Sequence, residues 1–219
     1  CALVHPPDAL DKPVVCRGDG LGGSIVAAPK LIFPATRQGS NEVNVLPADS
    51  LPTPFPESYW VLPGQFLAGE YPGARRAGQP SPRLTALLEA GITRFIDLTR
   101  EGELPDYGDA LRDESYRFHP VLRRRSSIGD FGLPGYTQMK NILDEIDQAL
   151  ATGEKVYLHC QAGIGRTGTV VGCYLARHGY PGRAALLRLN ELRHRLPFPF
   201  PSPETEAQRR FVLDWQPED

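Results

Sequence analysis

One cysteine and one arginine, six positions apart, are the residues of this sequence best suited to chemistry on an anion. Between Cys160 and Arg166 lie five small or compact residues, Gln161, Ala162, Gly163, Ile164 and Gly165. We expect this loop to curl so that its backbone N–H groups point inward and bind a tetrahedral anion such as phosphate. The same N–H groups favour the thiolate of Cys160, which is the nucleophilic form, and Arg166 adds a two-pronged donor for phosphate oxygens.

The segments on either side of this loop are expected to position it. Val156–His159 is a short apolar run typical of a buried strand, and residues 166–178 are apolar on nearly all sides, as in a central helix. A strand that leads through a glycine-rich loop into a helix places the cysteine near the positive end of the helix dipole.

From residue 57 onward the chain alternates between strand and helix patterns. Pro63-Gly64 is a turn dipeptide between two apolar runs and predicts a hairpin. Ser81 is expected to cap a helix that starts at Pro82 and that Gly91 ends. Further strands are expected at 92–99 and 115–121, a long polar loop at 122–135, and further helices at 136–152, after Pro181 and at 204–215. This order predicts an α/β fold with a central, mostly parallel sheet flanked by helices.

The first part of the chain has a different composition. Residues 1–56 are rich in Pro and Gly and are predicted to form an irregular N-terminal extension, which ends in the stiff linker Leu51–Pro56. Residues 57–219 are predicted to form a single domain.

Composition excludes several classes of protein. The 219 residues carry a formal net charge of −2, which gives no general signal for nucleic-acid binding. No apolar run approaches the roughly 18 residues of a membrane span, and no secretory signal is evident, so that we expect a cytoplasmic protein. The four cysteines, Cys1, Cys16, Cys160 and Cys173, form no C-x-x-C pair, and we expect neither a metal nor a cofactor.

The glycines of the loop also allow a nucleotide-binding interpretation. Gly163, Gly165 and Gly168 spell G-x-G-x-x-G between a strand and a helix. A dinucleotide fold also requires a second strand that ends in an acidic residue about 20 positions later, where this sequence has a helical pattern. A P-loop is excluded because the loop lacks the Gly-Lys-Ser/Thr ending.

His159–Thr169, HCQAGIGRTGT, resembles the active-site signature of the cysteine-dependent protein tyrosine and dual-specificity phosphatases, which is His-Cys, five residues, Arg, and Ser or Thr. Thr99–Tyr107 is similar to a segment of the cyclin-dependent-kinase-associated phosphatases, and Glu204–Phe211 resembles the glutamine loop of the classical tyrosine phosphatases. The similarity covers about residues 58 to 217 and implies the cysteine phosphatase fold.

The resemblance also suggests roles for further residues. The family takes its general acid from a mobile loop about thirty residues before the cysteine, and Asp130 in DFGLP fits this place. Thr167 is expected to donate a hydrogen bond to the cysteine sulfur, and His159 to support the loop from behind. Glu204 stands where the family has a glutamine that orients the attacking water, and Gln208 matches a second glutamine; both are expected to support the site.

The roles of several other residues are less certain from the sequence. Asp106 and Asp109 are weaker candidates for the acid. Cys173 is expected in the core, with a redox role as partner of an oxidised Cys160 as the alternative. Arg123–Arg125 is expected to be a solvated loop face, or else to attract an anionic substrate.

We therefore expect hydrolysis of phosphotyrosine in a phosphorylated protein or peptide, with phosphoserine and phosphothreonine as further substrates, through a cysteinyl-phosphate. One alternative is a phosphatase of phosphoinositides or inositol phosphates, which Arg123–Arg125 would suit, although the loop lacks the lysines often found in lipid phosphatases. A catalytically silent phosphoprotein-binding module is the alternative from another class. A sulfurtransferase of the rhodanese type is disfavoured because its loop is shorter.

Overall fold

The computed structural model describes residues 51–76, 79, 81–198 and 200–216. Its strands are β1 (Ser58–Leu62), β2 (Phe66–Gly69), β3 (Arg94–Asp97), β4 (Leu122–Arg125) and β5 (Val156–His159). Its helices are α1 (Pro82–Glu89), α2 (Gly108–Ser115), α3 (Tyr136–Ala151), α4 (Gly165–Arg177), α5 (Arg183–Arg193) and α6 (Glu206–Leu213). The predicted extension over residues 1–56 lies almost entirely outside the described residues and stays a prediction.

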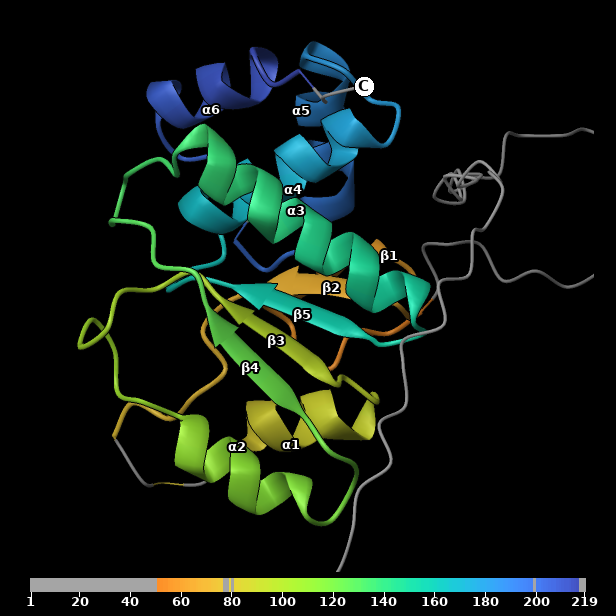
Figure 1. Ribbon diagram of the computed structural model, residues 1–219, viewed down its shortest axis with the longest axis vertical. Helices are drawn as coiled ribbons and strands as arrows, with labels where there is room; N and C mark the ends of the chain where they lie inside the picture. The colour runs from red at the N-terminus through yellow and green to blue at the C-terminus, as the bar shows by residue number, and fades with distance from the viewer. Residues whose placement is uncertain (1–50, 77–78, 80, 199, 217–219) are drawn as a thin grey trace, which may run out of the picture. The chain divides into compact units, whose positions relative to one another are not determined.

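The five strands form one sheet in the order β1-β2-β5-β3-β4, with helices on both faces (Figure 1). Only the β1–β2 pair is antiparallel, and the pairs β2–β5, β5–β3 and β3–β4 are parallel. Helices α1 and α2 cover one face, and α3 to α6 lie on the other. The predicted α/β fold with a mostly parallel sheet is confirmed. Strand β5 lies in the middle, so the loop that follows it starts at the centre of the carboxyl edge.

The hairpin and the first helix form where their punctuating residues predict them. Gly64 has φ +71°, which suits a turn between β1 and β2, and Gly91 has φ +81° just beyond α1. Pro82 is the first residue of α1, but Ser81 does not cap it with its side chain. The Ser81 hydroxyl instead donates to the carbonyl oxygen of Pro72.

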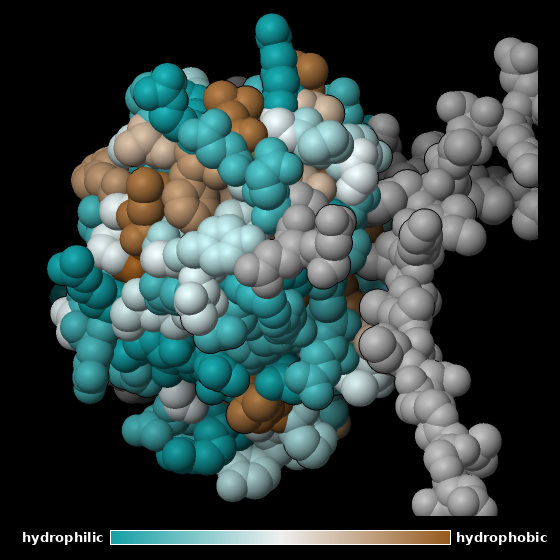
Figure 2. Space-filling view, turned by 45° about the horizontal axis from the view of Figure 1, so that its top comes forward, coloured by the Kyte–Doolittle hydropathy of each residue, from teal (hydrophilic) through white to brown (hydrophobic). Residues whose placement is uncertain are grey.

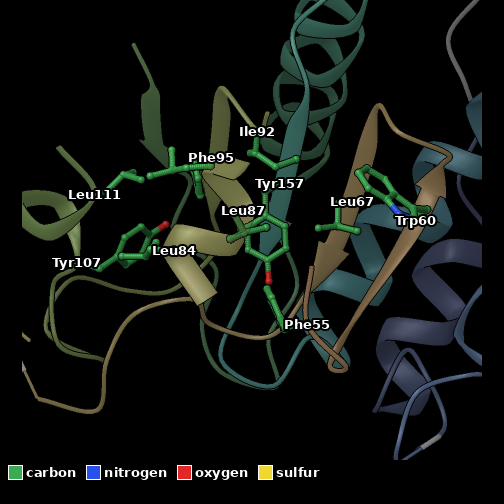
Figure 3. Close-up of a cluster of buried hydrophobic side chains, with 11 residues drawn as sticks. Phe55, Trp60, Leu67, Leu84, Leu87, Ile92, Phe95, Tyr107, Leu111 and Tyr157 are labelled. Carbon is green, nitrogen blue, oxygen red and sulfur yellow. The ribbon is translucent and has the colours of Figure 1, made fainter. Parts of the chain in front are cut away.

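A large apolar cluster fills the space between the sheet and α1 (Figure 3). Its members are Phe55, Trp60, Leu67, Leu84, Leu87, Leu88, Ile92, Phe95, Tyr107, Leu111 and Tyr157. Phe55 belongs to the segment that was expected to be a linker, and Trp60 Nε1 donates to the carbonyl oxygen of Pro52 at 3.2 Å. Residues 51–56 therefore pack on the domain.

The strand predicted at 115–121 is wrong. Ser115 is the last residue of α2, and Tyr116 and Phe118 are 82 % and 39 % exposed. The alternation of aromatic and polar residues in this stretch indicated a half-buried strand, but no face of it is buried. The preceding residues 108–115 form a short amphipathic helix that buries Leu111, and the chain then turns into β4.

The long loop predicted at 122–135 begins with a strand instead. Residues 122–125 form β4 at the edge of the sheet. Side chains alternate across a strand, so Arg123 and Arg125 both reach the buried carboxylate of Asp97, at 2.7 and 3.2 Å, while Arg124 pairs with Glu145 at 3.3 Å. Arg123–Arg125 therefore lies in a strand and not in a loop, and all three guanidinium groups form ion pairs within the domain.

Figure 2 shows one face of the molecule, which is mostly hydrophilic with separate apolar patches. Aromatic side chains with more than half of their surface exposed among the described residues are Tyr116, Phe131, Phe198 and Phe200. Phe131 belongs to the loop that carries Asp130, and so apolar surface lies next to the candidate acid.

Candidate active site

The loop between β5 and α4 has the features expected of an anion cradle. Cys160 follows β5 directly and is only 3 % exposed. The main-chain N–H groups of residues 161–164 have no acceptor within the described part of the chain. The first N–H groups of α4, which begins at Gly165, lack intrahelical partners as at any helix N-terminus. The loop and the helix end therefore present a series of free donors beside the cysteine.

Gly163 allows the loop to lie against strand β2. Its φ is +67°, and a Cβ atom at this position would lie 2.5 Å from the carbonyl carbon of Gly69 and 2.6 Å from its oxygen. Both the left-handed backbone and the lack of space exclude other residues here. The close packing fixes the loop on the end of the neighbouring strand.

Arg166 lies at the start of α4 with only 2 % of its surface exposed. Glu103 accepts hydrogen bonds from Nη1 at 2.8 Å and from Nη2 at 2.6 Å, and the carbonyl oxygen of Ile128 accepts a third from Nη1 at 3.2 Å. Burial is the largest single effect and would lower the pKa of Arg166, but the hydrogen bonds to Glu103 and the surrounding negative charges together raise this pKa above its usual value. The same bonds hold the pKa of Glu103 below its usual value.

These contacts leave one edge of the Arg166 guanidinium for a ligand. Glu103 occupies the end formed by Nη1 and Nη2, and Ile128 takes the outer side of Nη1. Nε has no acceptor within the described residues, and it lies on the same edge as the second N–H of Nη2. This edge is a two-pronged donor of the kind that phosphate oxygens accept in pairs.

The structure brings Asp130 to this arginine. Its Oδ1 lies 3.1 Å from Arg166 Nη2, and its side chain is 54 % exposed. The N–H of Phe131 donates to the same carboxylate at 3.2 Å, and Phe131 has φ +55°, which bends the backbone just after the acid. The candidate acid therefore faces the cradle from a loop that remains open to solvent.

His159 lies behind the cradle and is fully buried. Its Nδ1 lies 3.0 Å from the carbonyl oxygen of Cys160, which can only accept, so Nδ1 carries the proton. Nε2 then accepts from the hydroxyl of Tyr107 at 2.6 Å. Burial lowers the pKa of His159. A neutral, doubly hydrogen-bonded histidine fits the expected supporting position.

Thr167 and its neighbour Thr169 differ in their partners. The Thr169 hydroxyl donates to the carbonyl oxygen of Gly165 at 2.8 Å, as helical threonines often do. The Thr167 hydroxyl is buried and has no hydrogen-bond partner in the described part of the chain. The expected hydrogen bond from Thr167 to the Cys160 sulfur is not formed in this structure, which leaves the hydroxyl available.

Glu204 and Gln208 both lie beside the loop. A Cβ atom on Gly165 would lie 3.0 Å from Glu204 Oε2 and 3.0 Å from Gln208 Oε1. Gln208 is fully buried and completes a capping box with Thr205, while its Nε2 donates to the carbonyl oxygen of Gly132 at 3.1 Å. Gln208 thus connects α6 to the loop of Asp130. Glu204, unlike Gln208, is exposed to solvent.

The other candidate residues lie elsewhere or are occupied. Asp106 pairs with Arg123 and Arg125, at 2.8 and 3.1 Å, and Asp109 is 87 % exposed and pairs with Arg112 on α2. Cys173 is a free thiol buried within α4, and burial raises its pKa. Cys1 and Cys16 lie outside the described residues.

Two features are absent from the described residues. No group of three or more His, Cys, Asp or Glu side chains there is arranged to hold a metal ion. None of the described helices is both long and apolar enough to cross a membrane.

Sequence reasoning missed Glu103 although the surrounding stretch was matched. Glu103 follows β3 by six residues, and β3 lies beside β5 in the sheet. The carboxyl ends of parallel neighbours meet at one edge, so an acidic residue there was a signal for a partner of Arg166. Tyr107, which holds His159, gave no signal beyond its apolar ring.

The comparisons with known proteins agree with this geometry. A family model described as "Polymorphic toxin system, DSP-PTPase phosphatase" matches residues 71–180, half of the chain. The chain belongs to this phosphatase family. The matched range contains Cys160, Arg166, Asp130 and Glu103, and the resemblance found in the sequence is confirmed at the level of the family.

Relatives and solved structures extend the comparison. "Protein tyrosine phosphatase domain-containing protein 1" of Mus musculus is 35 % identical over 96 residues, which are 40 % of this chain and 13 % of that protein. The crystal structure of Tk-PTP in the active form is 24 % identical with a TM-score of 0.56, covering 72 % of this chain and 95 % of that one. The kinase associated phosphatase, crystallised with its catalytic cysteine replaced by serine, is 19 % identical with a TM-score of 0.56, covering 67 % and 83 %.

The chain spans only about an eighth of the length of the first curated relatives. The likeness to them is therefore that of a domain within longer proteins. The two solved structures support the cysteine phosphatase fold.

Proposed function

We propose that the chain hydrolyses phosphate monoesters on proteins, phosphotyrosine first and phosphoserine and phosphothreonine in addition, through a cysteinyl-phosphate intermediate. The 3.1 Å contact between Asp130 Oδ1 and Arg166 Nη2 is the observation that supports this most directly. It brings a carboxyl group to the arginine of the cysteine loop, whose Nε has no acceptor among the described residues. A binding module needs the arginine but has no use for an acid at that place.

In the first step, the Cys160 thiolate attacks phosphorus in line with the leaving oxygen, and an S–P bond forms as the P–O bond breaks. Protonated Asp130 gives its proton to that oxygen. The loop N–H groups and the free edge of Arg166 hold the three equatorial oxygens, where charge is spread in the transition state.

In the second step, a water molecule attacks phosphorus and the S–P bond breaks. The carboxylate of Asp130 takes the proton of the water, which regenerates its acid form. The Thr167 hydroxyl, which has no partner among the described residues, is available to donate to the departing thiolate. The Glu204 carboxylate and the Gln208 amide lie next to Gly165 and are the groups placed to orient the water.

The proposal requires Asp130 to change partners. In this structure its carboxylate lies 3.1 Å from Arg166 Nη2, which the phosphate would also contact. Arrival of the phosphate dianion repels the carboxylate from Arg166 toward the leaving oxygen, where the first step places it. The half-exposed loop of Asp130 permits this movement without disturbing the buried Arg166–Glu103 pair.

Turnover of a small aryl phosphate tests this function. Cys160→Ser should abolish release of phosphate and retain binding of phosphate, and Asp130→Asn should lower turnover and remove the basic limb of a bell-shaped pH profile. Asp109→Asn is the matched control, because Asp109 is exposed on α2 and pairs only with Arg112. Unchanged turnover in Cys160→Ser would refute the nucleophile, and a surviving basic limb in Asp130→Asn would place the acid elsewhere.

Turnover of several substrates separates the alternative functions. A panel of phosphotyrosine and phosphothreonine peptides and a phosphoinositide shows the preferred substrate. The main sequence argument for a phosphoinositide was Arg123–Arg125, and these side chains are engaged with Asp97, Asp106 and Glu145. Binding of phosphopeptides by the unaltered chain without any turnover would instead establish a silent module. Action in the cytoplasm on a phosphorylated protein partner remains part of the proposal.

A further inference from the structure

Four carbonyl groups of the cysteine loop are held by donors outside the loop or at its edge. Each of these carbonyl oxygens accepts one such hydrogen bond. The pairs are Cys160 with His159 Nδ1 at 3.0 Å, Gln161 with the N–H of Tyr71 at 2.9 Å, Gly163 with Arg193 Nη1 at 2.7 Å, and Ile164 with Ser202 Oγ at 2.7 Å.

The direction of a carbonyl fixes the direction of the next N–H. In a trans peptide the C=O and the N–H of the same unit point to opposite sides, and the loop peptides are trans. The N–H groups of residues 161, 162, 164 and 165 therefore point away from the four donors. Those of residues 161, 162 and 164 find no acceptor in the described part of the chain. Donors on the surrounding elements thus turn the free N–H groups toward the inside of the loop.

We propose that Arg193 and Ser202 are positioning residues of this loop: by holding the carbonyl groups of Gly163 and Ile164, they aim the following N–H groups at the phosphate. This inference rests on the proposed function, since it concerns the same anion site. Neither residue touches the reacting atoms, and each acts through a peptide unit of the loop.

Arg193 is unusual because it is a buried cation without an anionic partner among the described residues. It is the last residue of α5, is 4 % exposed, and forms no ion pair with the described residues. Its guanidinium lies 5.4 Å from the centre of the Tyr59 ring, which gives a modest cation–π attraction. Burying an unpaired charge is costly, and packing alone does not require an arginine here. Its hydrogen bond to Gly163 and its positive charge beside an anion site account for it.

Ser202 reaches the loop through a space that a glycine leaves open. A Cβ atom on Gly168 of α4 would lie 2.1 Å from Ser202 Oγ. The absence of a side chain at position 168 lets the hydroxyl approach the carbonyl oxygen of Ile164, which also accepts from the N–H of Gly168 at 3.1 Å. Ser202 therefore adds a second donor at the point where the loop becomes helix.

The test measures phosphate binding apart from catalysis. Inorganic phosphate is titrated calorimetrically into the full chain carrying Cys160→Ser, and then into the same protein with Arg193→Met or Ser202→Ala. Removing one donor from an oxyanion site costs about 100- to 1,000-fold in rate. A donor that is only misdirected costs less, so we expect phosphate binding to weaken about 10- to 100-fold for Arg193→Met and about 3- to 10-fold for Ser202→Ala.

The control is Arg188→Met, on the same helix, where the arginine pairs with Glu191 at the surface. It should leave phosphate affinity unchanged. In the active protein with Cys160 intact, kcat/KM should fall by the same factor as phosphate affinity in each variant. A purely structural role would lower the melting temperature and leave the phosphate affinity of the folded protein as it was.

The outcomes test this inference separately from the proposed function on which it rests. Weaker phosphate binding by the variants supports the inference even if the wild-type chain turns over no ester, a result that would refute only the proposed function. Unchanged binding in folded Arg193→Met and Ser202→Ala overturns the inference, as does a Cys160→Ser protein that binds no phosphate. If Arg193→Met does not fold, Ser202→Ala decides, because it removes a single hydroxyl group.

Discussion

Glu103 offers the sharpest test of how the site is built, because it anchors the arginine without touching the phosphate. In Glu103→Gln the shape is kept, but the amide accepts only one of the two hydrogen bonds that Arg166 donates at 2.6 and 2.8 Å. The amide NH2 group then faces an N–H group of Arg166, and two donors cannot bond each other. The substitution therefore breaks the fork and leaves the buried guanidinium held on one side only.

The burial of this pair sets the size of the effect. Arg166 is 2 % exposed and Glu103 17 %, so the value of about 0.2–1 kcal/mol for exposed ion pairs does not apply. Loss of one charged hydrogen bond costs about 1.5–3 kcal/mol. A domain of this size loses about 2–4 °C in melting temperature per kcal/mol, which gives about 3–12 °C. The freed guanidinium also loses its fixed edge, and we expect phosphate affinity to fall about tenfold, or about 1.4 kcal/mol.

The pH dependence of this effect has a definite sign. Arg166 holds the pKa of Glu103 below its usual value, so folding stability from this group is complete above about pH 4.3, the value in an unfolded chain, and is lost as the pH falls through the folded pKa. The difference in melting temperature between the wild type and Glu103→Gln should thus be constant near pH 7 and shrink below pH 4. Thermal unfolding followed by circular dichroism measures it, with Asp109→Asn as the exposed control. A melting temperature within 1 °C of the wild type, together with unchanged phosphate affinity, would refute this reasoning.

Three further substitutions test the loop, its support and the fold. Gly163→Ala should cost about 2–4 kcal/mol in urea unfolding, because the methyl group would meet the carbonyl of Gly69 and the backbone is left-handed; a wild-type midpoint would contradict this packing. Tyr107→Phe leaves Nε2 of His159 buried without a donor and should lower the free energy of unfolding by about 1–3 kcal/mol, an effect absent if water replaces the hydroxyl. Tyr116→Ser should change stability by less than about 0.5 kcal/mol, since the ring is 82 % exposed; a larger loss would restore the strand predicted there.

Much of the fold follows from patterns that tertiary contacts do not override. Helix α3 has a complete apolar stripe, and Pro63-Gly64 marks a tight turn, so both are found where they were predicted. Strand β4 was missed because its sequence, LRRR, looks polar and solvated. Its stability comes from β3 alongside it and from Asp97, a partner 26 residues earlier that no local pattern reveals. Edge strands with buried ion pairs are thus a case in which hydrophobic periodicity fails.

The part of the site that lies in one continuous stretch of sequence was predictable. Cys160, the loop and Arg166 lie within seven residues, and their roles as an anion cradle follow from residue types and spacing alone. Assigning Asp130 to the site required the family resemblance, because strand order decides which two loops at the edge of a sheet lie close together. Glu103, Arg193 and Ser202 were missed because each reaches the loop from a different element. Residues that position a loop carry less sequence signal than residues that form it.

The three glycines of the loop illustrate how an identical pattern can arise for unrelated reasons. In a dinucleotide fold, G-x-G-x-x-G serves a tight turn, a pyrophosphate and the packing of a helix on a strand. Here Gly163 makes room for the backbone of Gly69, Gly165 for the side chains of Glu204 and Gln208, and Gly168 for the hydroxyl of Ser202. Each glycine thus lets another part of the protein lie close to the loop. The motif therefore supports a phosphate site in both folds, but its neighbours, and not its spacing, decide which chemistry follows.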